Sequence, residues 1–466
     1  VIEIKVHSSG GRWASDKLSF QVKFKDPFAD PELNFDLFAG TADAENAVTE
    51  FDTFILDAGY NYIWNHSNAA QRNFARFVSD QVAADLQNFA SGGGVAPHGK
   101  YVHLYLDGVY WGLYNLHERA DEHFAADYFG GNNDDYYVVK HANTDNEHNF
   151  TYVNGGYAAE DAFGVLLAAT QNARNNPTNL AAYQAVAEIL DIDQFIDYFI
   201  VHMYAGNEPD WPHNNWYATL DSVDPNGQWR FHSWDQEHAF PTTDNGDAFN
   251  ELSDPTDTGS EDDEGPGDVF HDLIQHGEFR LRFADRVQAL LRNGGVLTES
   301  VAQAIFEARL DEIDQAIIAE SARWGDNRVD ADPYTRQDWL NIVRDETGDG
   351  LAVVPDFFPV RTNSLLGHIA ARGWLQSLVA PQYNNYGGEV ASGFDVIISK
   401  PVGSPGPAEI YYTVDGSDPR LPNGSANPLA QHAVGPITID IAASQQIKAR
   451  IKNGADWSAI IEATFT

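Results

Sequence analysis

The sequence predicts an α+β fold followed by a small β-sandwich. Apolar residues recur every three or four positions over long stretches, which is typical of amphipathic helices. Between these stretches lie hairpin patterns, in which aromatic and β-branched runs flank short polar turns. From about Leu378 the sequence changes to short alternating strands separated by Gly, Pro and Asn turns, a pattern typical of a β-sandwich. With 466 residues, the chain can bury a large core in more than one domain.

The first clear element is a β-hairpin over residues 101–116. Its residues alternate around Asp107-Gly108, a pair that favours a two-residue type I′ turn. We expect Val102, Leu104 and Leu106 to share one face of this hairpin. A helix should follow it, because acidic residues such as Asp121 and Glu122 are favourable at a helix N-terminus.

A second helix and hairpin are predicted over residues 191–235. The helix presents one apolar stripe, with Asp191 as its N-cap, and Gly206 and Pro209 end it. Two aromatic runs, 216–220 and 228–234, then flank the turn residues 224–227. The loop residue Asp210 and the residues at the hairpin ends, Asn215 and Asp235, should therefore lie close together.

This arrangement suggests phosphotransfer chemistry. Protein kinases place a catalytic Asp and a metal-binding Asn in a D-x-x-x-x-N pattern, with a second metal-binding Asp after a short hairpin. Asp210 and Asn215 have this spacing, and Asp235 follows the hairpin. Mg2+ takes oxygen ligands from carboxylates and phosphates. The alternative is a capping Asp, a turn Asn and a salt-bridged Asp in a chain that has 69 acidic residues.

Two longer motifs resemble the CotH kinase family of atypical, secreted or spore-coat protein kinases. One is Asn207–Trp216 followed by Gln228–Asp235, and the other is Tyr101–Glu122 with its Tyr-Trp-Gly-x-Tyr-x-Leu core. Strand-like matches at 2–11 and 19–25 extend the resemblance over roughly residues 1–375. The resemblance implies an atypical, protein-kinase-like two-lobed domain over 1–375. Its activity would be transfer of the ATP γ-phosphate to a Ser or Thr hydroxyl of a protein.

The resemblance also implies roles for individual residues. Asp210 would orient or deprotonate the acceptor hydroxyl. Asn215 and Asp235 would hold Mg2+ or Mn2+, with Glu237 assisting. A lysine such as Lys23 or Lys140 would bind the phosphates, and Glu118 would border the nucleotide cleft and pair with that lysine.

The sequence departs from the family pattern at several positions. Lys5, Gln21 and Ser79 stand where arginine is usual, and Glu237 replaces a second Asp. Charged donors hold phosphate oxygens best. These departures favour an alternative function, a catalytically inactive pseudokinase-like module that binds protein or polysaccharide at the cell surface. The intact set of Asp210, Asn215 and Asp235 favours the enzyme.

The C-terminal region resembles the chitobiase/hexosaminidase C-terminal type of domain. Residues 387–390 and 408–420 carry this resemblance, which covers most of 380–466. Such domains are small immunoglobulin-like appendages of secreted, polysaccharide-active proteins. The resemblance implies an extracellular or cell-surface protein whose partners are a protein acceptor or a matrix- or polysaccharide-associated protein.

The segment between the hairpin and the sandwich has two parts. Residues 241–268 contain ten acidic residues and no Lys or Arg, so we expect a solvated loop. A calcium site among Asp254, Asp257, Asp262 and Asp263 is a further hypothesis, although EF-hand spacing is absent. Residues 269–323 and 335–375 are predicted to be helical. The first stretch supplies an apolar face formed by Phe270, Leu273, Ile274, Phe279, Leu281, Phe283, Val287, Leu290 and Leu291.

Composition narrows the possible partners. The chain has 28 basic and 69 acidic residues and a net charge of −41, which argues against nucleic acid and anionic membranes as main partners. Such an acidic surface fits an extracellular protein. The absence of cysteine excludes disulfides and thiolate metal sites. There is no apolar run long enough to predict a membrane span. Because the chain opens with Val1 in mid-strand, we expect that a leader or another domain precedes it.

Overall fold

The computed structural model describes residues 2–7, 14–24, 32–142, 148–207, 211–241, 264–329, 331–345 and 352–466. Its contacts divide the chain into two compact units. Unit 1 comprises Val1–Ala168, Ala187–Phe270 and Glu299–Leu365, and unit 2 comprises Ala169–Val186, His271–Thr298 and Leu366–Thr466. The chain thus leaves unit 1 and returns to it twice before it ends in unit 2. The domain limits expected from the sequence, 1–375 and 380–466, stay a prediction.

The first sheet of unit 1 has five antiparallel strands in the order β1-β2-β5-β7-β6. They are β1 (Ile2–His7), β2 (Ser19–Phe24), β5 (Thr53–Asp57), β6 (Gly99–Leu106) and β7 (Val109–His117). The predicted hairpin of residues 101–116 is confirmed as β6 and β7. Asp107 and Gly108 connect them with φ of 49° and 78°, as a type I′ turn requires. A small pair, β3 (Leu33–Asn34) and β4 (Glu50–Phe51), lies between β2 and β5 in the sequence.

The second sheet of unit 1 is antiparallel with the order β11-β10-β8-β9. Its strands are β8 (Tyr136–His141), β9 (Phe150–Asn154), β10 (Trp216–Asp221) and β11 (Arg230–Ser233). The predicted hairpin after residue 215 is therefore confirmed as β10 and β11. Trp216 pairs with Ser233 at its open end, so the residues before β10 lie beside those after β11.

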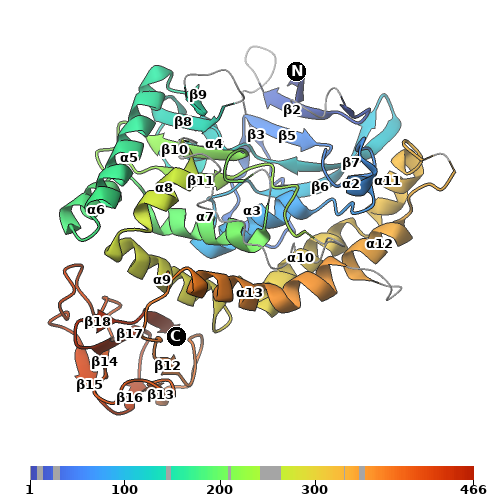
Figure 1. The fold of residues 1–466 in the computed structure, drawn as a ribbon. Coiled ribbons are helices and arrows are strands. Elements are labelled where there is room, and N and C mark those ends of the chain that lie inside the picture. The colour runs from blue at the N-terminus through green and yellow to red at the C-terminus, as the bar shows by residue number, and fades with distance from the viewer. Residues whose placement is uncertain are drawn as a thin grey trace. The chain divides into compact units, whose positions relative to one another are not determined.

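Two central helices of unit 1 are α3 (Ser79–Ser91) and α7 (Ile192–Ala205), which lie side by side below the strands in Figure 1. The sequence-predicted caps of α7 are confirmed. The Asp191 side chain accepts a hydrogen bond from the backbone N–H of Gln194, and Gly206 ends the helix with φ of 70°. The apolar stripe of α7 is buried because this helix packs against both α3 and β11.

The remaining helices follow from shorter periodic segments. Asp121 caps α4 (Glu122–Phe129), as its position after the hairpin predicts. The predicted helical stretches after residue 269 are confirmed in the described residues, with interruptions at 274–276, 292–298 and 314–315. The nine apolar residues expected on the face of the first stretch are all buried. The further helices are α2 (Ala69–Arg72), α5 (Tyr157–Asn175), α6 (Leu180–Ala187), α8 (Pro266–Leu273), α9 (Gly277–Leu291), α10 (Glu299–Ile313), α11 (Ala316–Trp324), α12 (Arg336–Arg344), α13 (Phe358–Ala371), the short η1 (Ala44–Asn46) and η2 (Asn133–Asp135), and the π-helical η3 (Val353–Phe357).

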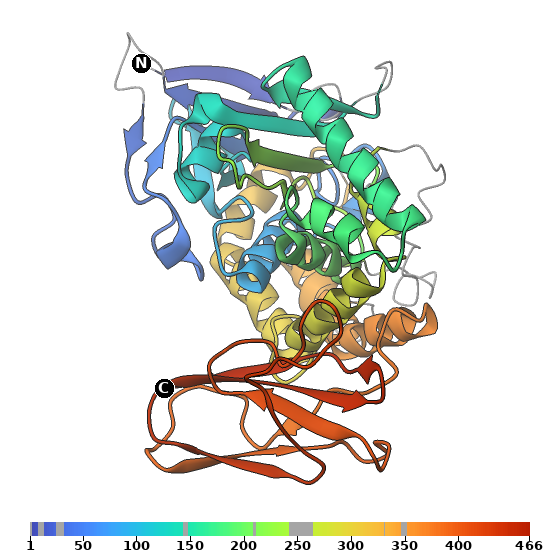
Figure 2. The ribbon, with the colours of Figure 1, turned by 90° about the vertical axis from the view of Figure 1, so that its left-hand side faces the viewer.

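The C-terminal part of unit 2 consists of two antiparallel sheets, drawn from orange to red as two layers in Figure 2. One contains β12 (Gln382–Tyr383), β13 (Phe394–Ser399) and β16 (Ile437–Ile441). The other contains β14 (Glu409–Thr413), β15 (Gln431–Ala433), β17 (Gln445–Asn453), β18 (Asp456–Trp457) and β19 (Ile461–Phe465). Alternate residues of both sheets, such as Val396 and Ile451, form one buried core. The short alternating strands are confirmed, and the immunoglobulin-like class stays a prediction.

The structure also bears on the membrane expectation. Among the helices of the described residues, none is long and apolar enough to cross a bilayer. Residues 242–263, which include the hypothetical calcium ligands, lie outside the described residues.

Candidate functional site

The β10–β11 hairpin brings Asn215 and Asp235 into contact. The side-chain amide Nδ2 of Asn215 donates a hydrogen bond of 3.1 Å to the backbone oxygen of Asp235. Both residues have left-handed backbones, with φ of 58° and 56°. Asn and Asp enter this region more readily than other non-glycine residues. The pairing thus places one amide and one carboxylate at the open end of the hairpin, as the sequence predicts.

His141, at the end of β8, holds the other side of Asn215. Its Nδ1 lies 2.9 Å from the backbone N of Asn215, which donates to it. Burial, with a smaller contribution from the charge of Lys140, lowers the pKa of His141 to about 4. The ring is therefore neutral near pH 7, as an accepting nitrogen requires.

Gln236 ties this region to α3. Its side-chain Nε2 donates to the backbone oxygens of Asn215 and Trp234, at 3.0 and 2.7 Å. Its backbone N–H donates to Asp80 Oδ1 at 2.6 Å. Because Asp80 lies in the first turn of α3, the segment after β11 is fixed to that helix.

Glu237 is buried, lines a small cavity together with Asp57 and Asp80, and binds a loop through its carboxylate. Its Oε1 accepts the backbone N–H of Tyr60, and its Oε2 accepts the backbone and side-chain N–H groups of Asn61, at 2.6 to 3.0 Å. Burial, followed by the charges of Asp235 and Asp57, raises the pKa of Glu237 well above its usual value. These contacts give Glu237 the role of anchoring the 59–61 loop.

Asp210 lies outside the described residues, but both of its flanks are held against α7. Trp211 donates from Nε1 to the hydroxyl of Tyr198 at 2.7 Å and stacks on His202. Asn207 is buried, and its backbone oxygen accepts the N–H of Trp211 at 3.1 Å. Asn207 and Trp211, the described residues on either side of Asp210, are therefore fixed in position.

His7, at the end of β1, is half-buried and lies near Trp234. The His7 and Trp234 rings lie 6.1 Å apart, centroid to centroid. Burial lowers the pKa of His7 to about 4; the charge of Asp57 opposes this shift, and the positive charges of Arg119 and Lys140 add to it. Lys140 also acts on His141. The predicted phosphate ligand Lys140 stands opposite Tyr217 in the β8–β10 register, and Arg119 donates to the Tyr217 hydroxyl at 3.4 Å. The Tyr217 and Trp234 rings lie 5.0 Å apart, centroid to centroid. Arg119 has no predicted role in the sequence.

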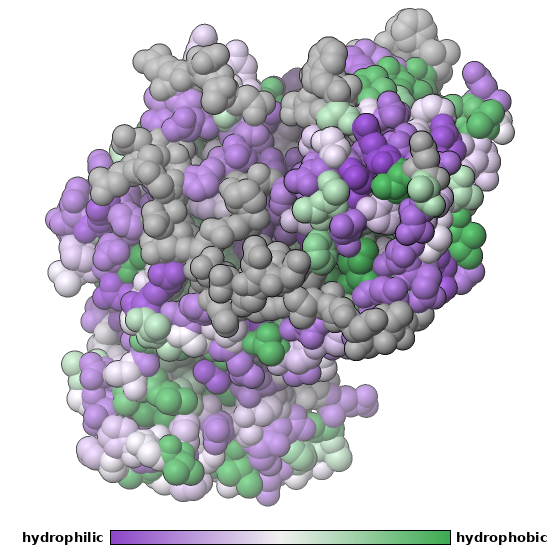
Figure 3. All heavy atoms as spheres, turned by 45° about the vertical axis from the view of Figure 1, so that its right-hand side comes forward, coloured by the Kyte–Doolittle hydropathy of each residue, from purple (hydrophilic) through white to green (hydrophobic). Residues whose placement is uncertain are grey.

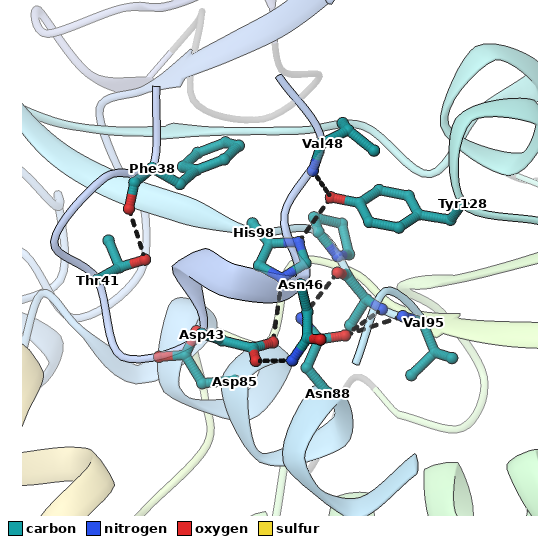
Figure 4. Close-up of polar contacts among 12 residues, drawn as sticks. Phe38, Thr41, Asp43, Asn46, Val48, Asp85, Asn88, Val95, His98 and Tyr128 are labelled. Atoms are coloured by element: carbon teal, nitrogen blue, oxygen red, sulfur yellow. Dashed lines mark hydrogen bonds and ion pairs between the residues drawn. The ribbon is translucent and has the colours of Figure 1, made fainter. Parts of the chain in front are cut away.

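The other two predicted cofactor ligands lie elsewhere in unit 1. Lys23 lies on β2, opposite Glu3 of β1 and Thr53 of β5. Glu118 is buried, and its carboxylate accepts hydrogen bonds from the Tyr128 hydroxyl and from the backbone N–H of His98. In the described part of the chain, the ion-pair partner of Glu118 is the imidazole of His98, which lies between Asp43 and Tyr128 in Figure 4.

An arginine contacts Ser79, the position at which the family usually has an arginine. Arg76, three residues earlier, is buried, and its Nε donates to Ser79 Oγ at 3.1 Å. The guanidinium lies 3.9 Å from the centre of the Tyr62 ring. Burial lowers the pKa of Arg76 to about 10, so it stays charged near pH 7. The departure at Ser79 therefore does not remove positive charge from this part of the fold.

Comparisons with known proteins agree with the motifs. A family model described as CotH kinase protein matches residues 9–344, well over half of the chain. A search of curated proteins finds no match. The resemblance of residues 380–466 to chitobiase-type domains stays a prediction. A kinase-like family suggests, in general terms, that its members use ATP, a divalent metal and a protein substrate. On the extent of the family match, the chain belongs to the CotH kinase family.

Proposed function

We propose that this chain is a metal-dependent phosphotransferase that moves the γ-phosphate of ATP to a Ser or Thr hydroxyl of a protein. The observation that carries the proposal is the contact between Asn215 and Asp235 at the open end of the β10–β11 hairpin. In protein kinases an amide and a carboxylate hold the metal ions that bridge the ATP phosphates. Two residues in left-handed backbone conformation at one point of a fold also favour a functional site.

The donor set of this site fits Mg2+ or Mn2+. Asn215 and Asp235 offer amide and carboxylate oxygens, which both ions accept. When bound, the ion would neutralise the phosphate charge and fix the phosphate geometry. Gln236 holds the backbone of Asn215, and Glu237 anchors the same segment to the 59–61 loop. We assign Glu237 a positioning role in place of direct metal binding.

The phosphates need positive partners, and we propose Lys140 and Arg119. Lys140 stands opposite Tyr217 in the β8–β10 register, and Arg119 donates to the Tyr217 hydroxyl, whose ring lies beside Trp234. Lys23 is the weaker candidate, because its strand neighbours are Glu3 and Thr53, and neither belongs to the segment around Asn215 and Asp235. Asp210 would orient or deprotonate the acceptor hydroxyl, in a loop whose flanks α7 holds.

We further propose that the protein acts outside the cell or at its surface. Its net charge of −41 and the resemblance of residues 380–466 to appendages of secreted proteins support this location. The C-terminal sheets would then serve as an appendage that brings the enzyme to matrix- or polysaccharide-associated protein acceptors.

Calorimetric titration of ATP tests the binding part of the proposal. The wild-type chain should bind ATP with Mg2+ or Mn2+ and much more weakly without the ion. Asp235→Ala and Asn215→Gly should lose the metal-dependent part of the affinity. Asp161→Ala, which removes an exposed acid of α5, is the matched control and should bind as the wild type does. Equal ATP binding with and without the ion, or in wild type and Asp235→Ala, would contradict the proposed metal site.

A further inference from the structure

Three potential metal ligands converge where the first sheet of unit 1 meets α3. Asp57 is the last residue of β5, His117 is the last residue of β7, and Asp80 lies in the first turn of α3. One ligand atom from each residue lies within 4.8 Å of the other two. Asp57 and Asp80 are half-buried and His117 is buried. Asn215 and Asp235 do not belong to this group.

The hydrogen bonds of His117 leave one ring nitrogen for a ligand. Its Nδ1 lies 2.6 Å from the backbone oxygen of Glu118. A carbonyl oxygen can only accept, so Nδ1 carries the proton. In the neutral ring, Nε2 then has its lone pair available. Metal-binding histidines are commonly oriented in this way, by donating the other ring N–H to a backbone carbonyl.

Asp57 and Asp80 are each held in place through one of their two carboxylate oxygens. Asp57 Oδ1 accepts the Ser19 hydroxyl at 2.6 Å and the backbone N–H of Gly59 at 3.1 Å. Asp80 Oδ1 accepts the backbone N–H of Gln236 at 2.6 Å. In each residue these hydrogen bonds fall on Oδ1, so Oδ2 can bind an ion while Oδ1 keeps the carboxylate oriented.

An unpartnered amide oxygen provides independent support. Asn115 is 8% exposed, and its Oδ1 has no hydrogen-bond partner. The amide orientation is fixed, because Gln81 donates from Nε2 to Asp85 and Pro97, which leaves Gln81 Oε1 to accept from Asn115 Nδ2. A buried amide oxygen without a partner costs about 1–3 kcal/mol.

Asn115 also lines the same cavity as Asp57 and Asp80. Asn115 stands opposite Asp57 in the β5–β7 register, so their side chains lie on one face of the sheet. His117, two residues along β7, is on that face too. Asp57, Asp80 and Asn115 line one cavity of about 30 Å³, which is enough for a water molecule or an ion.

We propose that Asp57, Asp80 and His117 bind a divalent transition-metal ion, with Asn115 as a further oxygen donor. The imidazole decides the class of ion. Mg2+ and Ca2+ take oxygen ligands, whereas Zn2+ and Mn2+ accept a mixture of carboxylate and imidazole. An ion here would join β5, β7 and α3 and, through Asp80, the segment of Gln236. This ion site does not depend on the proposed phosphotransfer, because neither Asn215 nor Asp235, the proposed ligands of the ATP-bound metal, is among its ligands.

The experiment measures ions retained by the full-length chain. The protein is equilibrated with Zn2+ or Mn2+ in excess Mg2+ and high salt, which compete for weak sites on the acidic surface. It is then desalted, and its metal content is determined. The wild type should retain one ion per chain. Asp80→Asn and His117→Gln should each weaken binding by ~10-fold or more. His103→Gln, on the exposed side of β6, is the matched control and should retain the ion.

Two further measurements keep the test decisive. Asp235→Ala should keep this ion while it loses the metal-dependent ATP affinity, which separates the two sites. If His117→Gln does not fold, as judged by circular dichroism, pulsed electron paramagnetic resonance of the Mn2+-loaded wild type should still detect a coordinated imidazole nitrogen. A wild type that retains no ion, an Asp80→Asn variant that retains it equally well, or a Mn2+ centre without imidazole coordination would overturn the proposal.

Discussion

Asn215 combines a backbone role with a proposed ligand role, and substitutions can separate the two. Its φ of 58° lies in the left-handed region, which is unfavourable for residues other than Gly, Asn and Asp. Asn215→Ala should lower the free energy of unfolding by about 1–2 kcal/mol. Asn215→Gly should cost less, because glycine adopts this conformation freely. Both variants should lose metal-dependent ATP binding. Urea denaturation with calorimetry checks this prediction, and a glycine variant that binds ATP normally would contradict the ligand role.

His98 should make stability depend on pH. Burial alone would lower its pKa, but hydrogen bonds to Asp43 and Glu118 raise the pKa of His98 to about 9. The unfolded value is near 6.5, so the stabilisation is complete below about pH 6.5 and is lost as pH rises to 9. The contribution is about 3 kcal/mol at most. Denaturation of wild type and His98→Gln across this range measures it, and a constant difference between the two would contradict the charged form.

Within single elements, most of the fold could be predicted from the sequence because the signals are local. The apolar stripe of α7, its Asp191 cap and its Gly206 end are all contained in residues 191–206. The same holds for the β6–β7 and β10–β11 hairpins, whose turns are set by neighbouring residues. The contact of Asn215 with Asp235 could be predicted because one hairpin brings them together.

Contacts between distant segments could not be predicted. Glu237 binds a loop 177 residues earlier in the chain, and Asp57 and Asp80 approach His117 from three different elements. Arg76 also contacts a distant segment, because its guanidinium donates to the backbone oxygen of His238, 162 residues later. Sequence patterns report which face of an element is apolar, and not which polar residues from other elements meet it.

One ion pair joins α9 to β17 within unit 2. Arg450 donates to both carboxylate oxygens of Asp285, at 2.7 and 2.6 Å, and both side chains are 2% exposed. Arg450 also binds Asp418. The compact unit therefore includes α9 together with the C-terminal sheets. Asp285 and Arg450 are 165 positions apart, so no local pattern could predict the pair.

Breaking this pair should destabilise unit 2 strongly. Asp285→Ala leaves the buried Arg450 with only part of its counter-charge, so we expect a loss of about 3–5 kcal/mol. Replacing both residues, as Asp285→Leu with Arg450→Met, should cost less, because no buried charge remains on either side. Arg292→Ala, which removes an exposed arginine at the C-terminal end of the same helix, is the control. Guanidinium denaturation measures all three, and a double variant less stable than Asp285→Ala would contradict this account.

For the whole molecule, charge is the dominant feature. The 69 acidic and 28 basic residues leave a net charge of −41, and the face drawn in Figure 3 is mostly hydrophilic where it is coloured. Charges that repel one another destabilise a compact state, and salt screens them over about 10 Å at 0.1 M. The melting temperature should therefore rise as NaCl is added at neutral pH. A melting temperature that falls with added NaCl would show that favourable ion pairs outweigh the repulsion.

The central claim, metal-dependent phosphotransfer, is tested most directly by transfer of radiolabelled γ-phosphate from ATP. The acceptors are the protein itself and an added Ser-rich protein, with Mg2+ or Mn2+ present. The wild type and the Asp161→Ala control should transfer phosphate, and Asp235→Ala should not, because the phosphates lose their metal ion. Asp210→Asn should transfer very slowly while it binds ATP almost normally. No transfer by the wild type with either ion, or equal transfer by wild type and Asp235→Ala, would contradict the claim.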